Sequence, residues 1–230
     1  MTRSQVIEQL TDLIVAVERS HPVRVAIDGV DAAGKTTLAD ELTPLIEALG
    51  RPVIRASVDG FHNPRAIRYR RGADSPTGYY LDSFDHDAIR DELLIPLGPG
   101  GNRKYCRAMF DHWADVPTHE PKRESPQDAI LLFDGIFLLR SELNECWDFR
   151  IFVDVDFTVS VERAVERDAR RNPALPTDKL QAQYACRYVP GQSIYLQTVR
   201  PRELANIVID NNDLANPGFV AHCTSDYQTT

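Results

Sequence analysis

The sequence predicts an α/β fold, a single domain over residues 1–230 in which helices flank a parallel β-sheet. Three observations predict it. Short runs rich in β-branched residues alternate with segments whose apolar residues recur at helical spacing. Residues Ala129–Phe133 form a near-continuous apolar run, as expected for a central parallel strand that is buried on both faces. A glycine-rich segment, Gly29–Thr36, joins the first predicted strand to the helix that follows it.

The amino-terminal part of the chain predicts two strand–helix units. Apolar residues at helical spacing predict a first helix over about residues 4–19. Residues 23–28 and 52–58 are short β-rich runs and predict the first two strands. Between these strands, the apolar residues of the segment 38–49 predict a helix. Pro44 is expected to kink or break it, because proline cannot donate the helical hydrogen bond.

The middle of the chain is less regular. Residues 60–83 are polar, aromatic and interrupted by glycine and proline, which favours a loop or a small insertion. Asp85 is placed to cap a helix that runs through Ile95. A turn is expected at Gly98–Gly101, and residues 103–111 predict a strand or a hairpin.

The remaining elements continue the alternation. Residues 149–155 predict a strand, and two helices are expected over about residues 158–170 and 178–188. The run 206–210 predicts a last strand. The polar tail, residues 213–230, is given no structure.

Composition excludes several classes of protein. Hydrophobic residues make up 43% of the chain and charged residues 26%, which is ordinary for a globular protein and excludes a membrane-spanning bundle. The formal charge is -8, whereas a binder of nucleic acid or of an anionic membrane normally carries an excess of bases. The cysteines, among them Cys223, form no C-x-x-C pair, and the amino terminus shows no apolar signal segment. We therefore expect a cytoplasmic protein without nucleic-acid or membrane partners.

Gly29–Thr36 fits the phosphate-binding pattern G-x-x-x-x-G-K-[ST] at every defined position. Glycines let the backbone amides curl around phosphate oxygens, and the amino end of the next helix is electropositive. Lys35 can reach the outer phosphates, and the Thr36 hydroxyl can bind Mg²⁺. The alternative is a chance glycine turn. The predicted ATP-binding residues are Gly29, Val30, Asp31, Ala32, Ala33, Gly34, Lys35, Thr36 and Thr37.

Two acidic residues follow predicted strands. Asp59 comes after the second strand and Asp134 after the run Ala129–Phe133. Parallel strands end at the same edge of a sheet, so both carboxylates should converge on the phosphate-binding loop. Asp134 is suited to hold Mg²⁺, directly or through water, and Asp59 to accept a proton from an incoming hydroxyl or to share the metal. The alternative for each is a turn before the glycine that follows it.

Arginines supply local positive charge in this acidic chain. One cluster follows Asp59 and consists of Arg65, Arg68, Arg70 and Arg71. A second shares one face of a predicted helix and consists of Arg163, Arg167, Arg170 and Arg171. Arginine binds phosphate oxygens with two parallel hydrogen bonds, so the second cluster could close over ATP. The alternative is a solvated helix whose arginines pair with neighbouring acids.

The histidines form no zinc pattern. His62 and His112 are candidate substrate contacts, because each lies close to an acidic residue in the predicted cleft region. Histidines that serve only a turn or the core are the alternative.

Taken in order, these motifs make the sequence similar to the uridine kinase/phosphoribulokinase-like family of P-loop kinases, over about residues 23–212. The segments that carry the resemblance are Gly29–Thr36, Asp59–His62 (D-x-F-[YH]), Phe110–His112 ([YF]-D-[FH]), Phe133–Ile136 (apolar-[ED]-G-[IV]), Arg163–Asp168 (R-x-x-x-R-D), Gln183–Tyr184 with Pro190, and Ala205–Ile209.

The resemblance implies ATP-dependent phosphorylation of a hydroxyl on a small metabolite. It implies a substrate-binding insertion over about residues 60–125 and a lid over about residues 160–175. Thr36 and Asp134 would hold Mg²⁺, with Asp134 in place of the more usual Glu. The implied catalytic residues are Asp59, Lys35, Arg163 and Arg167. The implied substrate contacts are His62, Arg68, Tyr79, Phe110, Asp111 and His112.

The departures from the family concern the substrate. Uridine kinases carry an aspartate in F-D-H-P before the next helix, and we match that stretch to Tyr79–Asp82, with Tyr79 near the aspartate. They also carry a pyrimidine-reading histidine where this chain has about Asp115. Uridine is the nearest acceptor, and a non-nucleoside alcohol, pantothenate-like or sugar, is the alternative. A nucleotide switch or an ATP-dependent regulator without an acceptor stays open, although the guanine-reading N-K-x-D motif is absent from the sequence. The motifs do not decide whether the chain forms a homo-oligomer.

Overall fold

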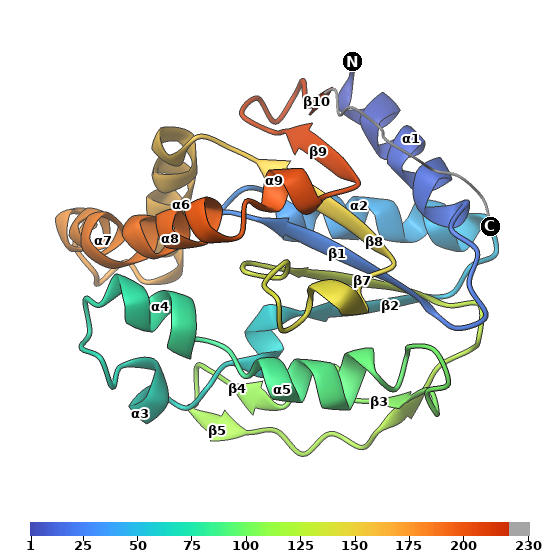
Figure 1. Ribbon diagram of the computed structural model, residues 1–230. Coiled ribbons are helices and arrows are strands. Elements are labelled where there is room, and N and C mark those ends of the chain that lie inside the picture. Colours follow the sequence, from blue (N-terminus) through green and yellow to red (C-terminus); the bar gives the residue numbers. More distant parts are fainter. Residues whose placement is uncertain (221–230) are drawn as a thin grey trace.

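The computed structural model describes residues 1–220 and has a six-stranded sheet at its centre (Figure 1). The strands lie in the order β10-β9-β8-β1-β7-β2. They are β1 (Val23–Gly29), β2 (Val53–Ser57), β7 (Ile130–Gly135), β8 (Phe149–Asp154), β9 (Ile207–Asp210) and β10 (Gly218–Val220). All neighbours pair in parallel except β10, which is antiparallel to β9. The predicted α/β fold is confirmed.

Apolar side chains of the central strands alternate between two cores. In β7, Ile130 and Leu132 face the core beneath helices α1 (Arg3–Val15) and α2 (Lys35–Ala48). Leu131 and Phe133 face the opposite core. Every residue of β7 is buried, as the near-continuous apolar run predicted.

The second core is covered by short helices from the middle and the end of the chain (Figure 1). These are α4 (Pro76–Asp82), α5 (His86–Ile89) with the π-helical segment η2 (Arg90–Leu94), and α8 (Val189–Thr198). Phe61, Phe137 and Tyr195 are its largest fully buried side chains outside β7. Asp85 caps α5 by accepting a hydrogen bond from the Ala88 amide at 2.9 Å, as predicted.

Several boundaries differ from the predictions. The first helix ends at Val15, although its apolar pattern extends to Val17. Helix α2 continues through Pro44, so the expected break is wrong. Pro44 faces solvent, while Leu42 and Ile46 on either side of it are fully buried against the sheet and hold the helix in place.

The expected loop at residues 60–83 contains helical turns instead. These are the 3₁₀ turn η1 (Val58–Phe61), α3 (Arg65–Arg68) and α4. The expected strand or hairpin at residues 103–111 is two short pairs: β3 (Lys104–Tyr105) with β6 (Arg123–Glu124), and β4 (Phe110–Asp111) with β5 (Val116–Pro117). A further 3₁₀ turn, η3 (Asn144–Cys146), precedes β8.

The carboxyl-terminal region is more structured than predicted. Helix α6 (Phe157–Arg171) agrees with the prediction, and the next helix is divided into α7 (Thr177–Gln183) and the π-helical η4 (Tyr184–Tyr188). Helices α8 and α9 (Pro201–Leu204) were not predicted, and neither was β10, which lies in the tail. Residues 221–230, including Cys223, lie outside the described part of the chain.

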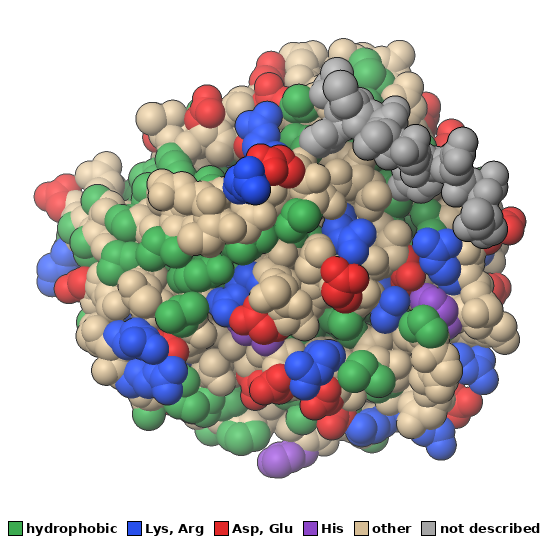
Figure 2. Space-filling view, in the orientation of Figure 1, with side chains coloured by type: hydrophobic (Ala, Val, Ile, Leu, Met, Phe, Trp, Pro, Cys, Tyr) green, Lys and Arg blue, Asp and Glu red, His purple; other side chains and the backbone are tan. Residues whose placement is uncertain are grey.

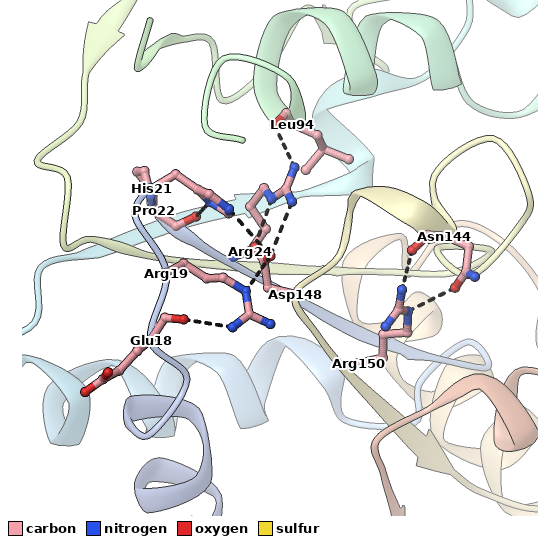
Figure 3. A network of polar contacts seen from close by, with 9 residues as sticks. All are labelled: Glu18, Arg19, His21, Pro22, Arg24, Leu94, Asn144, Asp148 and Arg150. Carbon is pink, nitrogen blue, oxygen red and sulfur yellow. Dashed lines mark hydrogen bonds and ion pairs between the residues drawn. The ribbon is translucent and has the colours of Figure 1, made fainter. Parts of the chain in front are cut away.

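A buried polar network fixes the amino ends of β1 and β8, away from the loops that follow the strands (Figure 3). Burial favours a neutral Asp148, but Arg24, whose Nε lies 2.9 Å from the carboxylate, holds the pKa of Asp148 below its usual value. Arg19 pairs with the same carboxylate at 3.3 Å. This network is structural, since its groups satisfy one another.

On the face shown in Figure 2, acidic and basic side chains are intermingled. Within residues 1–220, no helix combines the length and the apolar character that crossing a bilayer requires.

Candidate active site

The loop after β1 has the backbone that close approach to phosphates requires. A Cβ at Gly29 would lie 2.4 Å from the Val153 carbonyl oxygen, so only glycine fits beside β8. Ala32 has φ 53° and Gly34 has φ 94°, and Gly34 is the residue immediately before α2. Asn211 Nδ2 donates to the Ala33 carbonyl oxygen at 2.7 Å and fastens the loop to the end of β9. The loop is therefore pre-shaped, with its amides at the start of α2.

A cavity of about 650 Å³, which we call the nucleotide cavity, opens at the carboxyl ends of β1, β7 and β2. Most predicted ATP-binding side chains line it, together with both predicted acids. The lining includes Asp31, Ala32, Gly34, Lys35, Thr36, Thr37, Asp59, Asp134, Arg163 and Arg167. The parallel topology thus brings together residues that are separated by more than 100 positions.

Lys35 lies half-buried in this cavity and donates from Nζ to the Val30 carbonyl oxygen at 2.6 Å. Burial lowers the pKa of Lys35, and the nearby carboxylates of Asp31 and Asp28 oppose that shift. No carboxylate lies within ion-pair distance of Lys35 Nζ among the described residues, so its charge is available to an anionic ligand.

Thr36 and Asp134 meet as predicted. The Thr36 hydroxyl donates to Asp134 Oδ2 at 2.7 Å, and Asp134 Oδ1 lies 3.1 Å from Arg55 Nη2. A hydroxyl beside a carboxylate is an all-oxygen donor pair of the kind Mg²⁺ prefers. Arg55, on β2, also binds the Leu132 carbonyl oxygen and Asp40. Arg55 was not predicted, because it belongs to no recognised motif. The only indication in the sequence was a basic residue within an otherwise mainly apolar strand.

We expect Arg55→Gln to raise the Mg²⁺ concentration needed for half-maximal activity at least about tenfold, since groups that orient metal ligands typically contribute 10–100-fold to metal affinity. The variant removes the contact that orients Asp134 Oδ1. A Mg²⁺ titration of ADP release measures this. Asp40→Asn is the matched control, because it removes the other carboxylate partner of Arg55. Equal Mg²⁺ dependence of wild type and Arg55→Gln would contradict the assignment.

The arginines of α6 divide in their contacts. Arg163 donates to the carbonyl oxygens of Asn211 and Asn212, at 3.0 and 2.6 Å. Arg167 pairs with Asp168 at 2.8 Å and contacts the Tyr184 hydroxyl at 3.2 Å. Arg170 pairs with Glu166. All three arginines nevertheless line the nucleotide cavity. Arg167 and Arg170 thus pair with neighbouring acids, as the solvated-helix alternative describes, and the closure of this face over ATP stays a prediction.

A second cavity of about 520 Å³, which we call the acceptor cavity, adjoins the first. Asp31, Asp59, Ile136, Arg167 and Arg171 line both cavities. The acceptor cavity alone is lined by further aromatic and basic residues, among them His62, Arg65, Arg68, Tyr69, Tyr79, Phe84, His112, Arg187 and Tyr188. Four of the six predicted substrate contacts, namely His62, Arg68, Tyr79 and His112, therefore lie together.

Two predicted contacts lie elsewhere. Phe110 is buried in β4, and the Asp111 carboxylate accepts hydrogen bonds from the amides of Trp113 and Ala114 at 2.9 and 3.1 Å. Neither residue is among those that line the cavity. Arg70 and Arg71 also leave the predicted cluster, because both pair with the buried Asp82.

The two candidate histidines stack. Their rings lie 4.4 Å apart with 25° between their planes, and the His62 ring also lies 4.6 Å from that of Phe84. Burial lowers the pKa of His62 to about 4, so this ring is neutral near pH 7. His62 thus presents a neutral ring that packs against those of His112 and Phe84.

Helix α8 supplies contacts to the phosphate-binding loop that the sequence did not reveal. Gln192 accepts from the Asp31 amide at 2.8 Å and donates to the Asp31 carboxylate at 3.2 Å. Tyr79 donates to the same carboxylate at 3.0 Å. Deeper, the Tyr195 hydroxyl donates to Asp28, which is fully buried at the end of β1. The only sequence signal was the acid inside the strand Val23–Gly29.

We expect Tyr195→Phe to lower the free energy of unfolding by about 1–3 kcal/mol at pH 7.5, since Asp28 and the Leu139 amide both lose a partner. Burial raises the pKa of Asp28 to about 6, against the hydrogen bond from Tyr195 and the charge of Lys35. Below that pH the folded protein keeps a proton that the unfolded chain has released, so the stability contribution of Asp28 falls as pH rises from about 4 to 6.

The cost of Tyr195→Phe should therefore be smaller at pH 5, where Asp28 is largely neutral, because hydrogen bonds to ionised acceptors are stronger. Denaturant unfolding at both pH values measures it. Tyr105→Phe is the control, since Tyr105 is buried and its hydroxyl makes no hydrogen bond within residues 1–220. An equal loss at both pH values would show that the hydroxyl does not act through Asp28.

The sequence profile of the phosphoribulokinase / uridine kinase family matches residues 24–195, which include the phosphate-binding loop and most of both cavities. The chain belongs to this family. It is a P-loop kinase, and its family implies the use of ATP with a divalent metal ion. The oxygen donors Thr36 and Asp134 fit such an ion.

Relatives within the family are distant. The uridine kinase of Leuconostoc citreum (strain KM20) is 26% identical over 195 residues, which cover 82% of this chain and 87% of the relative. Uridine-cytidine kinase B of Dictyostelium discoideum is 27% identical over 157 residues, 64% of this chain and 59% of the relative.

Solved structures share the fold. A possible uridine kinase from Bacillus stearothermophilus has a TM-score of 0.69 at 23% identity, covering 89% of this chain and 97% of the other. The D-glycerate 3-kinase from Cryptococcus neoformans has a TM-score of 0.61 at 10% identity, covering 94% and 99%.

The structure corrects one match to the family. Helix α5 begins at His86, and Tyr79 lies inside α4. The segment before the next helix is therefore Phe84-Asp85-His86, identical to the F-D-H of uridine kinases. Asp115, which the resemblance places at about the pyrimidine-reading histidine, accepts hydrogen bonds from the Arg65 amide and from Arg68 Nη2, at 2.8 and 3.1 Å. It thus serves two arginines rather than the cavity.

Proposed function

We propose that this protein transfers the γ-phosphoryl group of Mg-ATP to a hydroxyl group of a small metabolite. The observation that carries the proposal is the position of Asp59, which lines both the nucleotide cavity and the acceptor cavity. Its carboxylate makes no hydrogen bond or ion pair within residues 1–220, so it is free to receive a hydroxyl proton.

The other residues have distinct roles in this proposal. The loop amides and Lys35 bind the phosphates, and Arg163 and Arg167 offset charge on the transferring group. Thr36 and Asp134 would hold Mg²⁺, which supplies charge neutralisation at the phosphate oxygens. The acceptor oxygen bonds to the γ-phosphorus as the bond from that phosphorus to the ADP oxygen breaks, and Asp59 takes the hydroxyl proton.

The first candidate acceptor is a nucleoside, uridine or cytidine. The names of the relatives support it. So do the rings of His62, His112 and Phe84 in the lining of the acceptor cavity, of which the two histidines are stacked, because a base can pack against such rings.

The second candidate is a non-nucleoside alcohol, such as a pantothenate-like compound, a sugar or a hydroxy acid. It is favoured by Asp115, which replaces a base-reading histidine and whose carboxylate pairs with Arg68.

ADP release with Mg-ATP against uridine, cytidine, pantothenate and sugars tests the proposal. An acceptor-dependent rate with a phosphorylated product supports it. ATP hydrolysis that no acceptor accelerates would favour a regulator instead, and selective binding of guanine nucleotides would favour a switch.

A further inference from the structure

The charges of the acceptor cavity are unevenly distributed. Its acids Asp31 and Asp59 also line the nucleotide cavity, so they lie at the shared end where phosphoryl transfer would occur. Arg65, Arg68 and Arg187 line the acceptor cavity and not the nucleotide cavity; we call them the arginine cluster. The remaining acid of the lining, Asp168, is already paired with Arg167 at 2.8 Å.

The arginine cluster surrounds one aromatic ring. The guanidinium carbons of Arg65, Arg68 and Arg187 lie 5.6, 5.8 and 4.7 Å from the centre of the Tyr69 ring. Within the described residues, the only carboxylate that pairs with the cluster is Asp115, 3.1 Å from Arg68. Three cations around one ring repel one another, and a single acid offsets only one of them.

Arg187 is the buried member, with 2% of its surface exposed. Its Nη1 donates to the carbonyl oxygens of Ala73, Ser75 and Gly72 at 2.9, 3.2 and 3.3 Å, and its Nη2 to that of Arg68 at 3.2 Å. These partners are neutral, and no acid in residues 1–220 pairs with it. A buried charge without a counter-charge is costly.

Two donors of the cluster are also unused. Arg68 Nε and Arg187 Nε are buried and have no hydrogen-bond partner within the described residues. Buried hydrogen-bond donors are normally paired with an acceptor, so an unpaired one needs an explanation. Both atoms are also closed off from the cavity, so an anionic group there would supply the missing charge and not a direct hydrogen bond to them.

We infer that the arginine cluster is a subsite for an anionic group, a carboxylate or a phosphate, on the alcohol that is phosphorylated. The acceptor then lies with its hydroxyl at Asp59 and its anionic group at the far end of the cavity. This inference rests on the proposed phosphoryl transfer, and it favours the second acceptor class over a neutral nucleoside.

Matched pairs of acceptors test the inference through ADP release with Mg-ATP. Pantothenate is compared with panthenol and D-glycerate with glycerol for a carboxylate, and ribose 5-phosphate with ribose for a phosphate; uridine is the neutral nucleoside. We expect the anionic member of at least one pair to have a kcat/KM at least about tenfold higher than its neutral partner, the effect of one hydrogen bond to a charged group. The inference would be overturned if the neutral member of every pair had a kcat/KM as high as that of its anionic partner, or if uridine were the preferred acceptor.

Variants then assign the preference to the cluster. Arg68→Gln should remove it and leave the KM for ATP unchanged, whereas Asp115→Asn should strengthen it, because it removes the competing carboxylate. Arg90→Gln, outside both cavities and paired with Asp87 and Asp91, is the control. Arg187→Gln also removes contacts to residues 72–75, so Arg187→Lys, which keeps the charge, accompanies it. A preference that survives Arg68→Gln, or that falls in Asp115→Asn, overturns the inference.

Binding separates this inference from the proposed function. If no acceptor stimulates ADP release, the proposed function fails. The inference is then decided by the midpoint of thermal unfolding with Mg-ADP and each of the three anionic compounds. The inference is supported if one anionic compound raises the midpoint, its neutral partner does not, and Arg68→Gln loses the effect. The inference is overturned if none of the three anionic compounds raises the midpoint in this way.

Discussion

Lys35→Ala should reduce kcat/KM for ATP at least about 100-fold, the usual cost of removing one charge-stabilising donor from a site that binds a developing anion. Lys35 is the one lysine among the described residues that line the nucleotide cavity. Within residues 1–220 its Nζ bonds only to a neutral carbonyl oxygen, so phosphate oxygens would replace a weaker partner. Steady-state ADP release and nucleotide binding by the purified variant measure the effect.

Lys104→Ala is the matched control, because Lys104 is exposed on β3 and lines neither cavity. The folded state of Lys35→Ala is checked by thermal unfolding. A variant that folds, binds ATP and turns it over at the rate of the wild type would end the assignment of Gly29–Thr36 as the ATP site.

Asp59→Asn should lower kcat by about 10²–10⁴-fold, the range of general base catalysis, while the KM for ATP stays close to that of the wild type. The amide keeps the shape of the side chain but cannot accept the hydroxyl proton. Asp59 makes no side-chain contact that holds the fold within residues 1–220, so the loss should be one of chemistry and not of stability.

Asp87→Asn, at an exposed acid that pairs with Arg90 outside both cavities, is the control. The split between kcat and KM decides the role. If ATP affinity and kcat fall together in Asp59→Asn, and added Mg²⁺ restores them, Asp59 is a metal ligand and not the base.

The phosphate-binding loop was predictable because the residues that form it are adjacent in the sequence. Gly29, Gly34, Lys35 and Thr36 must follow one another for a backbone to wrap phosphates and enter a helix. Asp59 and Asp134 required one further step, the rule that parallel strands end at one edge, and both line the cavity that the rule predicts.

The contacts that α8 makes with Asp31 and Asp28 could not be predicted from neighbouring residues or strand ends. Pro190 and Gly191 interrupt the helical pattern, and no helix was expected there. Proline is tolerated in the first turn, and a Cβ at Gly191 would lie 2.8 Å from the Tyr79 ring, so glycine lets α8 approach α4. Gln192 and Tyr195 reach Asp31 and Asp28 only because of that packing.

The hydrogen bonds of a turn explain why Asp111, a predicted substrate contact, does not line the acceptor cavity. Asp111 follows an aromatic residue in a family-like segment, yet its carboxylate satisfies two amides of the next turn, a use that short acidic side chains commonly have. Arg70 and Arg71 likewise pair with Asp82, whose burial the sequence did not indicate.

The sequence by itself determined the α/β alternation, the phosphate-binding loop and the two acids at its edge, because each depends on periodicity or on neighbours along the chain. Only the tertiary structure decided which side chains share the acceptor cavity. Arg187 lies more than 115 residues beyond Arg68, and their adjacency arises from the packing of η4 against the segment that joins α3 to α4. Burial then turned an ordinary arginine into an uncompensated charge, and that is a property of three-dimensional surroundings and not of any motif.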